Sequence, residues 1–177
     1  MIVLFVGGAR SGKSRLAEDF FHGRDDVCYI ATARVEDDEM AERVSFHRDM
    51  RNKSWRTAEA NYNLYSLVGM ENGYILDCLT VLSSNIMFDI TKDFELDRDL
   101  ANKVELEIKN ELSGLVEEIK KKKKTLVIVT NEVGMSIVPE NKLSRYFRDI
   151  QGRVNQFAAK LSDEVYLVVA GEKVKIK

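Results

Sequence analysis

The hydrophobic residues of this chain fall into short continuous runs separated by longer amphipathic segments. Such runs lie at 2–6, 27–31, 73–77, 125–130 and 165–169. A continuous apolar run is typical of a strand in a parallel sheet that is covered on both faces. The pattern therefore favours an α/β fold with a mostly parallel central sheet flanked by helices.

Helices are expected between these strands, where apolar residues recur at intervals of three and four. The spacing predicts helices over 15–21, 36–50, 61–68, 81–91, 99–120 and 143–161. A short strand is expected within 54–59, and 165–169 with 173–176 reads as a terminal antiparallel hairpin split by Gly171 and Glu172. Gly152 interrupts the apolar seam of the last helix, which indicates that another backbone approaches there.

Length and charge limit the possible functions. The chain has 177 residues, so we expect a single domain over 1–177. Its 27 basic and 29 acidic residues leave a net charge of −2, which gives no electrostatic footprint for nucleic acid. The lysines at 120–124 are best explained as a solvated helix end.

No apolar run is long enough for a membrane span, and the first residues form a strand and not a signal peptide, so we expect a cytoplasmic protein. Cys28 and Cys78 lie in apolar runs and are expected to be buried free thiols.

One motif carries specific chemistry. After the first strand the chain reads Gly-Gly-Ala-Arg-Ser-Gly-Lys-Ser at 7–14, which fits a phosphate-binding P-loop between a strand and a helix. The glycines let backbone N–H groups turn inward as an anion nest, and the helix start adds partial positive charge. We expect Lys13 to reach the outer phosphates and the Ser14 hydroxyl to bind Mg²⁺. The motif indicates a nucleoside triphosphate without specifying the base.

Other candidates lie where strands end. Thr32, Ala33 and Arg34 follow the second strand, at the edge where ligands bind in open α/β sheets, although an ordinary connection would look the same. Asp77 ends an apolar strand, as a Walker-B aspartate that holds Mg²⁺ does. Residues 131–134 follow the central strand and are a further candidate rim of the site.

His47 is the candidate nucleophile. A histidine on an amphipathic helix usually has a structural role. His47, however, has Arg43, Arg48 and Arg51 near it in sequence. Nearby arginines push a histidine toward its neutral, nucleophilic form and hold phosphates for it to attack. The spacing fits a phosphoryl or nucleotidyl acceptor.

Several blocks together resemble one family. They are the P-loop sequence, Tyr-Ile-Ala-Thr-Ala at 29–33, Asp-Asp-Glu-Met-Ala at 37–41, His47, Trp-Arg-Thr-Ala-Glu at 55–59, Thr-Asn-Glu-Val-Gly at 130–134, Val-Pro-Glu-Asn at 138–141 and Phe-Arg-Asp-Ile-Gln-Gly-Arg-Val-Asn-Gln at 147–156. In this order they resemble the bifunctional adenosylcobinamide kinase/adenosylcobinamide-phosphate guanylyltransferases, nearly end to end.

The resemblance implies a RecA-like P-loop fold, a homotrimer with sites near subunit interfaces, and two reactions of cobalamin biosynthesis. ATP or GTP phosphorylates the aminopropanol hydroxyl of adenosylcobinamide; GMP from GTP then passes through a guanylyl-histidine to the substrate phosphate, giving adenosylcobinamide-GDP. By position, the guanylylated histidine of the family corresponds to His47. The nucleotide contacts fall on Gly7, Gly8, Ala9, Arg10, Ser11, Gly12, Lys13, Ser14, Thr32, Ala33, Arg34, Arg48, Asp49, Met50, Arg51, Glu59 and Asp77.

The chain departs from the family at two places. Asn52 stands where members often carry proline, and Asp77 stands where glutamate is also seen, which affects local loop shape and metal reach. Three alternatives remain: a P-loop small-molecule kinase with a structural His47, a nucleotide-binding switch, and a nucleic-acid motor, which the near-neutral charge disfavours.

Overall fold

The central feature of the fold is a seven-stranded sheet in the order β3-β2-β4-β5-β1-β6-β7. The computed structural model describes residues 1–34, 52–92 and 95–177. All neighbouring strands are parallel except β6 and β7, which form the expected antiparallel hairpin. The strands are β1 Ile2–Gly7, β2 Val27–Ala31, β3 Arg56–Glu59, β4 Gly73–Asp77, β5 Thr125–Asn131, β6 Glu164–Val169 and β7 Glu172–Lys175.

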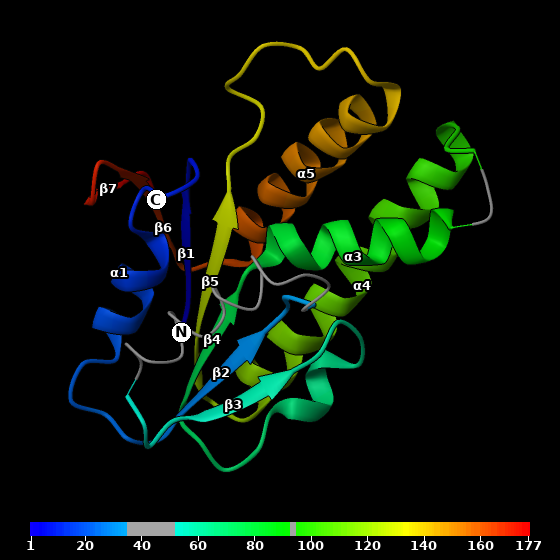
Figure 1. The fold of residues 1–177 in the computed structure, drawn as a ribbon. Coiled ribbons are helices and arrows are strands. Elements are labelled where there is room, and N and C mark those ends of the chain that lie inside the picture. The colour runs from blue at the N-terminus through cyan, green and yellow to red at the C-terminus, as the bar shows by residue number, and fades with distance from the viewer. Residues whose placement is uncertain (35–51, 93–94) are drawn as a thin grey trace.

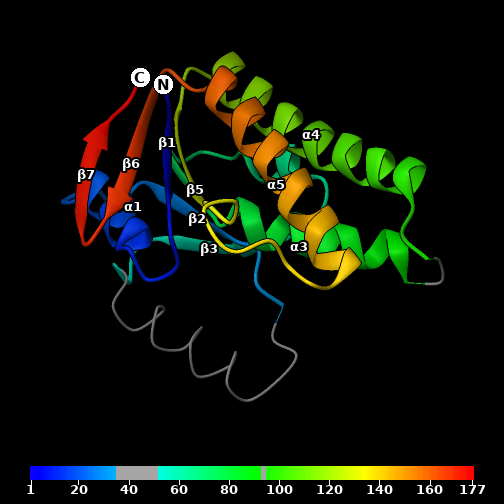
Figure 2. The same cartoon turned by 90° about the horizontal axis from the view of Figure 1, so that it is seen from above.

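Helices cover both faces of the sheet, as the apolar strands require. In Figures 1 and 2, α1 lies against one face, and α3, α4 and α5 lie against the other. The helices are α1 Lys13–Phe20, α3 Leu79–Thr91, α4 Arg98–Lys121 and α5 Lys142–Leu161, with a 3₁₀ turn, η1, at Leu64–Leu67. The α/β class and the mostly parallel sheet predicted from the sequence are therefore confirmed.

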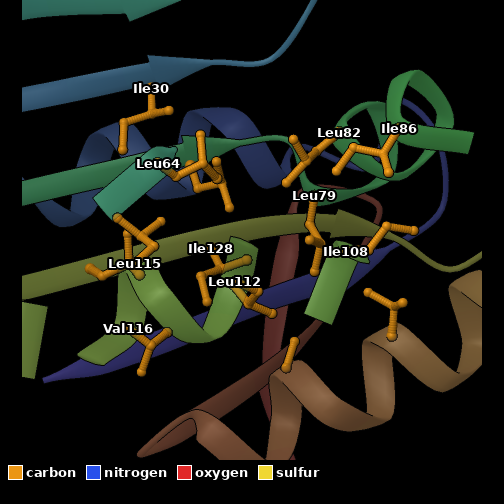
Figure 3. Packing of buried hydrophobic residues seen from close by; sticks show 14 of the residues in the cluster. Ile30, Leu64, Leu79, Leu82, Ile86, Ile108, Leu112, Leu115, Val116 and Ile128 are labelled. Atoms are coloured by element: carbon orange, nitrogen blue, oxygen red, sulfur yellow. The ribbon is translucent and has the colours of Figure 1, made fainter. Parts of the chain in front are cut away.

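The two faces of the sheet build two separate hydrophobic cores. Alternate residues of a strand point to opposite faces, so Ile128 joins the larger core under α3, α4 and α5, whereas Val127 joins the smaller core under α1. Figure 3 shows the larger core, in which Leu79 and Leu82 of α3 and Leu112 of α4 are fully buried. Both cores secure strand ends that carry the candidate site.

The helix predicted over 61–68 is wrong: only the 3₁₀ turn at Leu64–Leu67 forms there. Asn63 adopts a left-handed conformation, with φ of 56°. The Glu111 carboxylate of α4 accepts hydrogen bonds from the Asn63 and Leu64 N–H groups, each at 3.0 Å. This contact from a distant helix satisfies the start of the turn and fixes its short form.

The lysine run is not wholly a solvated helix end. Lys120 to Lys123 are exposed, but Lys124 is buried. Its Nζ donates to the Gly69 carbonyl at 2.7 Å and to the Glu71 carbonyl, and Lys122 Nζ donates to the Val68 carbonyl at 2.5 Å. Two members of the run therefore hold the loop that leads into β4.

The close approach expected at Gly152 is not made within the described residues. A Cβ added at Gly152 would have no atom within 4 Å. No helix in the described parts of the chain is long and apolar enough to cross a membrane.

An ion pair at the edge of the sheet gives the first testable expectation. Hydrogen bonding from the Arg56 guanidinium lowers the pKa of Glu71 to about 2. A lowered pKa means that ionised Glu71 stabilises the fold above its ordinary titration range, and that this contribution is lost as the pH falls toward 2. Because the Arg56 side chain is 41% exposed, solvent screening limits the effect. We expect Glu71→Gln to lower the free energy of unfolding by about 1 kcal/mol at pH 7.

Urea unfolding at pH 7, 4 and 3 checks this expectation. The difference between the wild type and Glu71→Gln should shrink as the pH decreases. Glu117→Gln, at an exposed position of α4, is the control and should show little difference at any of these pH values. A difference for Glu71→Gln that does not change with pH would contradict the assignment.

Candidate nucleotide-binding site

The candidate site is built at the carboxyl edge of the parallel strands. Strand register places Gly7 beside Asn131, and Ala31 beside both Asp77 and Glu59. The ends of five strands therefore lie at one edge of the sheet, where ligands bind in open α/β folds.

The P-loop leaves the start of α1 open to an anion. Arg10 and Gly12 are both left-handed, with φ of 56° and 99°, and Gly12 caps the helix without a side-chain hydrogen bond. The other α-helices with described N-caps receive side-chain caps from Cys78, Asp97 and Asn141. The uncapped N–H groups and the helix dipole of α1 thus suit a phosphate.

Lys13 is held inside the loop by the loop itself. It is only 6% exposed, and its Nζ donates to the Gly8 carbonyl at 2.6 Å and to Ser11 Oγ at 3.3 Å. Burial lowers the pKa of Lys13, and the negative charge of Asp77 acts in the opposite direction. The ammonium is therefore a partly desolvated cation within the phosphate nest, where a negative ligand gains most.

The C-terminal β6–β7 hairpin packs directly against the backbone of the P-loop. A Cβ at Gly7 would lie 2.2 Å from the Val168 carbonyl oxygen, and a Cβ at Gly12 would lie 3.2 Å from Gly171 Cα. The Gly171 N–H also donates to the Ser11 carbonyl at 2.9 Å. The P-loop thus depends on glycine both for its left-handed turn and for this close packing.

Asp77 lies at the end of β4, where the Tyr29 hydroxyl of β2 donates a hydrogen bond to its Oδ2. The Asp77–Cys78 peptide bond is cis. Thr32 Oγ1 accepts from the Cys78 N–H and donates to the Cys78 carbonyl, both at 2.9 Å. The Thr32 side chain therefore holds the strand ends together.

Cys78 is a free cysteine that directly follows Asp77 at this edge. Burial raises the pKa of its thiol to about 12, so the thiol stays neutral. Cys28 is buried as expected, and burial raises its pKa to about 11. Cys78 is only partly buried, so the expectation of burial was less accurate there.

Arg34 is bound to α3. Its guanidinium makes a bidentate ion pair with Asp89, at 2.7 and 2.6 Å, and the Tyr62 hydroxyl donates to the same carboxylate at 3.0 Å. The Arg34 hydrogen bonds lower the pKa of Asp89. Burial, followed by the bond to Asp89, raises the pKa of Tyr62 to about 12. Ala33 is half-buried, and Glu59 is exposed at the end of β3.

A buried polar network under Asn131 was missed by the sequence reasoning. Thr80 Oγ1 accepts from the Asn131 N–H at 2.6 Å and lies 3.1 Å from Thr130 Oγ1. Thr130 donates to Asn155 Oδ1 at 2.7 Å, and Gln151 Nε2 donates to both Thr130 and Asn155. The network ties β5 to α3 and α5. Its sequence signal was the presence of Gln151 and Asn155 within an otherwise apolar helix seam.

The donor set fits a magnesium ion bound together with phosphates. Ser14 and Asp77 offer hard oxygen donors, and Mg²⁺ typically takes one or two carboxylates with substrate oxygens and water. In the described part of the chain no group of three or more His, Cys, Asp or Glu side chains could hold a metal. Phosphate oxygens of a bound nucleotide would add further hard donors for such a cation.

Five of the expected site residues lie outside the described residues. They are His47, Arg48, Asp49, Met50 and Arg51. The helix expected over 36–50 lies there as well.

The fold and this edge of the sheet define a P-loop nucleotide-binding protein of the α/β class. Within that class the chain belongs to the cobinamide kinase/cobinamide phosphate guanyltransferase family, whose family model matches residues 3–176. The expected family is thereby confirmed over nearly the whole chain.

Individual relatives agree with this assignment. The chain is 44% identical to the "bifunctional adenosylcobalamin biosynthesis protein CobU" of Salmonella typhimurium and to that of Escherichia coli, with both chains of each pair fully covered. It is 34% identical to the corresponding CobP protein of Pseudomonas aeruginosa, over 98% of this chain and 96% of the other. Among solved structures, a KaiC-like protein of Pyrococcus horikoshii matches with a TM-score of 0.50 at 14% identity, over 94% of this chain and 69% of its own. This last likeness supports the fold alone.

The packing of Gly7 against β6 gives a second testable expectation. We expect Gly7→Ala to lower the free energy of unfolding by about 1–3 kcal/mol, because its Cβ would meet a backbone carbonyl that cannot move aside. Gly8→Ala is the matched control, since a Cβ there has no atom within 4 Å, and its effect should be below about 0.5 kcal/mol. Urea unfolding without nucleotide measures both. Equal stability of the two variants would show that the hairpin does not constrain the loop.

Proposed function

We propose that this chain phosphorylates adenosylcobinamide with a nucleoside triphosphate and then transfers GMP from GTP to the resulting phosphate. The observation that carries the proposal is the glycine-rich loop in front of an uncapped helix, with Lys13 inside it, in a chain that matches the family end to end. The proteins named CobU and CobP are described as bifunctional in adenosylcobalamin biosynthesis. Assigning the same pair of reactions to this chain rests on both observations.

In the kinase reaction the P-loop binds the triphosphate of ATP or GTP. Backbone N–H groups of the loop and of the start of α1 hold the phosphate oxygens, and Lys13 moves from the Gly8 carbonyl to the outer phosphates. The substrate hydroxyl then attacks the γ-phosphorus and gives up its proton, the bond from that phosphorus to the β–γ bridging oxygen breaks, and the nucleoside diphosphate leaves. A loose transition state needs positioning and positive charge more than a protein nucleophile.

In the second reaction His47 is the nucleophile. Its neutral imidazole attacks the α-phosphorus of GTP, forming a P–N bond as pyrophosphate leaves. The phosphate of adenosylcobinamide phosphate then attacks the same phosphorus, and the histidine departs, giving adenosylcobinamide-GDP. Arg48 and Arg51, close in sequence, would hold the phosphates.

Mg²⁺ is the cation proposed for the triphosphate, with Ser14 and Asp77 as its protein ligands. When bound, it would neutralise phosphate charge during transfer. The remaining residues that the resemblance assigns to the nucleotide, including Thr32, Arg34 and Glu59, stay proposed contacts. In the structure the Thr32 hydroxyl donates to the Cys78 carbonyl, and the Arg34 guanidinium donates to the Asp89 carboxylate.

We also propose a homotrimer, as the family resemblance implies. Supporting this, Gly152 on α5 leaves open space within the described chain, which a neighbouring subunit could approach closely. Near Gly152, Arg153 forms an ion pair with Glu105 of α4, and Arg148 forms an ion pair with Asp149. These ion pairs fix the positions of both arginine side chains. Arg145 instead donates to the Pro139 and Glu140 carbonyls, in the segment just before α5.

Analytical ultracentrifugation tests the trimer directly. Sedimentation equilibrium should give three times the chain mass of 20.2 kDa. Gly152→Phe should shift the distribution toward smaller species, because a large side chain would block a close approach. A monomer at micromolar concentration would reject the proposal.

Radiolabelled GTP separates the two reactions. With label in the α-phosphate, the wild type should acquire covalent GMP, and His47→Ala should lose that labelling by at least ~10³-fold. With label in the γ-phosphate, the same variant should still phosphorylate adenosylcobinamide. His22→Ala, at the other histidine of the chain, is the control and should retain both activities.

The outcomes distinguish the remaining alternatives. Phosphorylation without GMP labelling in the wild type would indicate a small-molecule kinase in which His47 is structural. Absence of both reactions with nucleotide still bound would indicate a nucleotide-binding switch. GMP labelling that persists in His47→Ala would remove His47 from the mechanism.

A further inference from the structure

Tyr29 is a buried residue whose hydroxyl reaches the candidate site. It is 3% exposed and lies in the smaller core, beneath α1, with Phe21, Trp55 and Ile75. Its ring contributes to that core as a phenylalanine ring would. The hydroxyl adds a polar group that must find a partner in this apolar setting.

That partner is the carboxylate of Asp77. Register places Tyr29 beside Ile75, so Tyr29 and Asp77 lie diagonally on the same face of two adjacent strands. The Tyr29 hydroxyl donates to Asp77 Oδ2, so Oδ1 is the carboxylate oxygen that Tyr29 does not engage. The bond thus restricts the rotation of a carboxylate at the edge of the sheet.

A second hydrogen bond between a tyrosine and a carboxylate, which involves the other end of β4, has a purely structural role and serves as a comparison. At the opposite end of the strand, the Tyr74 hydroxyl donates to Glu71 Oε2 at 3.0 Å. There the carboxylate is also bound by the Arg56 guanidinium, so its charge is compensated within the fold. Asp77 lies instead beside the phosphate loop, where its charge acts on Lys13.

We propose that Tyr29 is a positioning residue that orients Asp77 for the divalent cation of the bound nucleotide. The proposal rests on the proposed function, because it requires Asp77 to be a metal ligand. A hydrogen bond to one carboxylate oxygen fixes the direction of the other, and such outer partners commonly change metal affinity by about 10- to 100-fold when removed.

Mn²⁺ binding tests this inference without measuring activity. The probe is Mn²⁺ titrated by electron paramagnetic resonance into the full chain with a non-hydrolysable GTP analogue. We expect Tyr29→Phe to weaken Mn²⁺ binding about tenfold. The affinity for the analogue in the presence of EDTA should stay at the wild-type value, because Tyr29 acts only through the metal ligand. Tyr74→Phe is the matched control and should leave Mn²⁺ affinity unchanged.

A double variant shows whether Tyr29 acts through Asp77. Asp77→Asn alone should weaken Mn²⁺ binding, and adding Tyr29→Phe to it should cause no further loss. Wild-type Mn²⁺ affinity in Tyr29→Phe, or additive losses in the double variant, would overturn the positioning role while leaving the proposed function intact. Wild-type affinity in Asp77→Asn would overturn the metal assignment itself, and the role of Tyr29 with it.

Discussion

Parallel hydrogen bonding between β2, β4, β5 and β1 is the constraint on which the site depends. Because these strands run in one direction in fixed register, they all end at the same edge of the sheet, at Ala31, Asp77, Asn131 and Gly7. The apolar residues of each strand are buried on both faces, which secures that register. A slip by one residue would turn Asp77 toward the opposite face and separate it from the P-loop helix.

A second constraint joins the two ends of the chain. The P-loop near the N-terminus packs against the β6–β7 hairpin near the C-terminus, through Gly7 with Val168 and Gly12 with Gly171. The Gly171 N–H bond to Ser11 makes the hairpin part of the support for the loop. A phosphate nest needs its N–H groups aligned before the ligand arrives, so this rigid backing contributes to binding without touching the ligand.

Local sequence patterns predicted the strands, the P-loop and the position of Asp77, because each depends on a short stretch of chain. The sequence did not predict the features that depend on partners far along the chain. The Glu111 carboxylate binds the start of the 3₁₀ turn at Leu64–Leu67, where a helix was predicted. Lys124, at the end of the lysine run, is buried because its ammonium donates to backbone carbonyls of a distant loop. The bond between Tyr29 and Asp77 joins residues 48 positions apart, and no local pattern indicates such a pair. Assigning His47 still depends on family resemblance and sequence context.

Calorimetric titration of GTP in the presence of Mg²⁺ tests the central claim, that the loop at 7–14 holds the triphosphate. Lys13→Ala should bind GTP at least about tenfold more weakly, because the cation that the loop places on the outer phosphates is lost. Lys123→Ala, at an exposed position, should bind as the wild type does. Undiminished affinity in a folded Lys13→Ala would contradict the account.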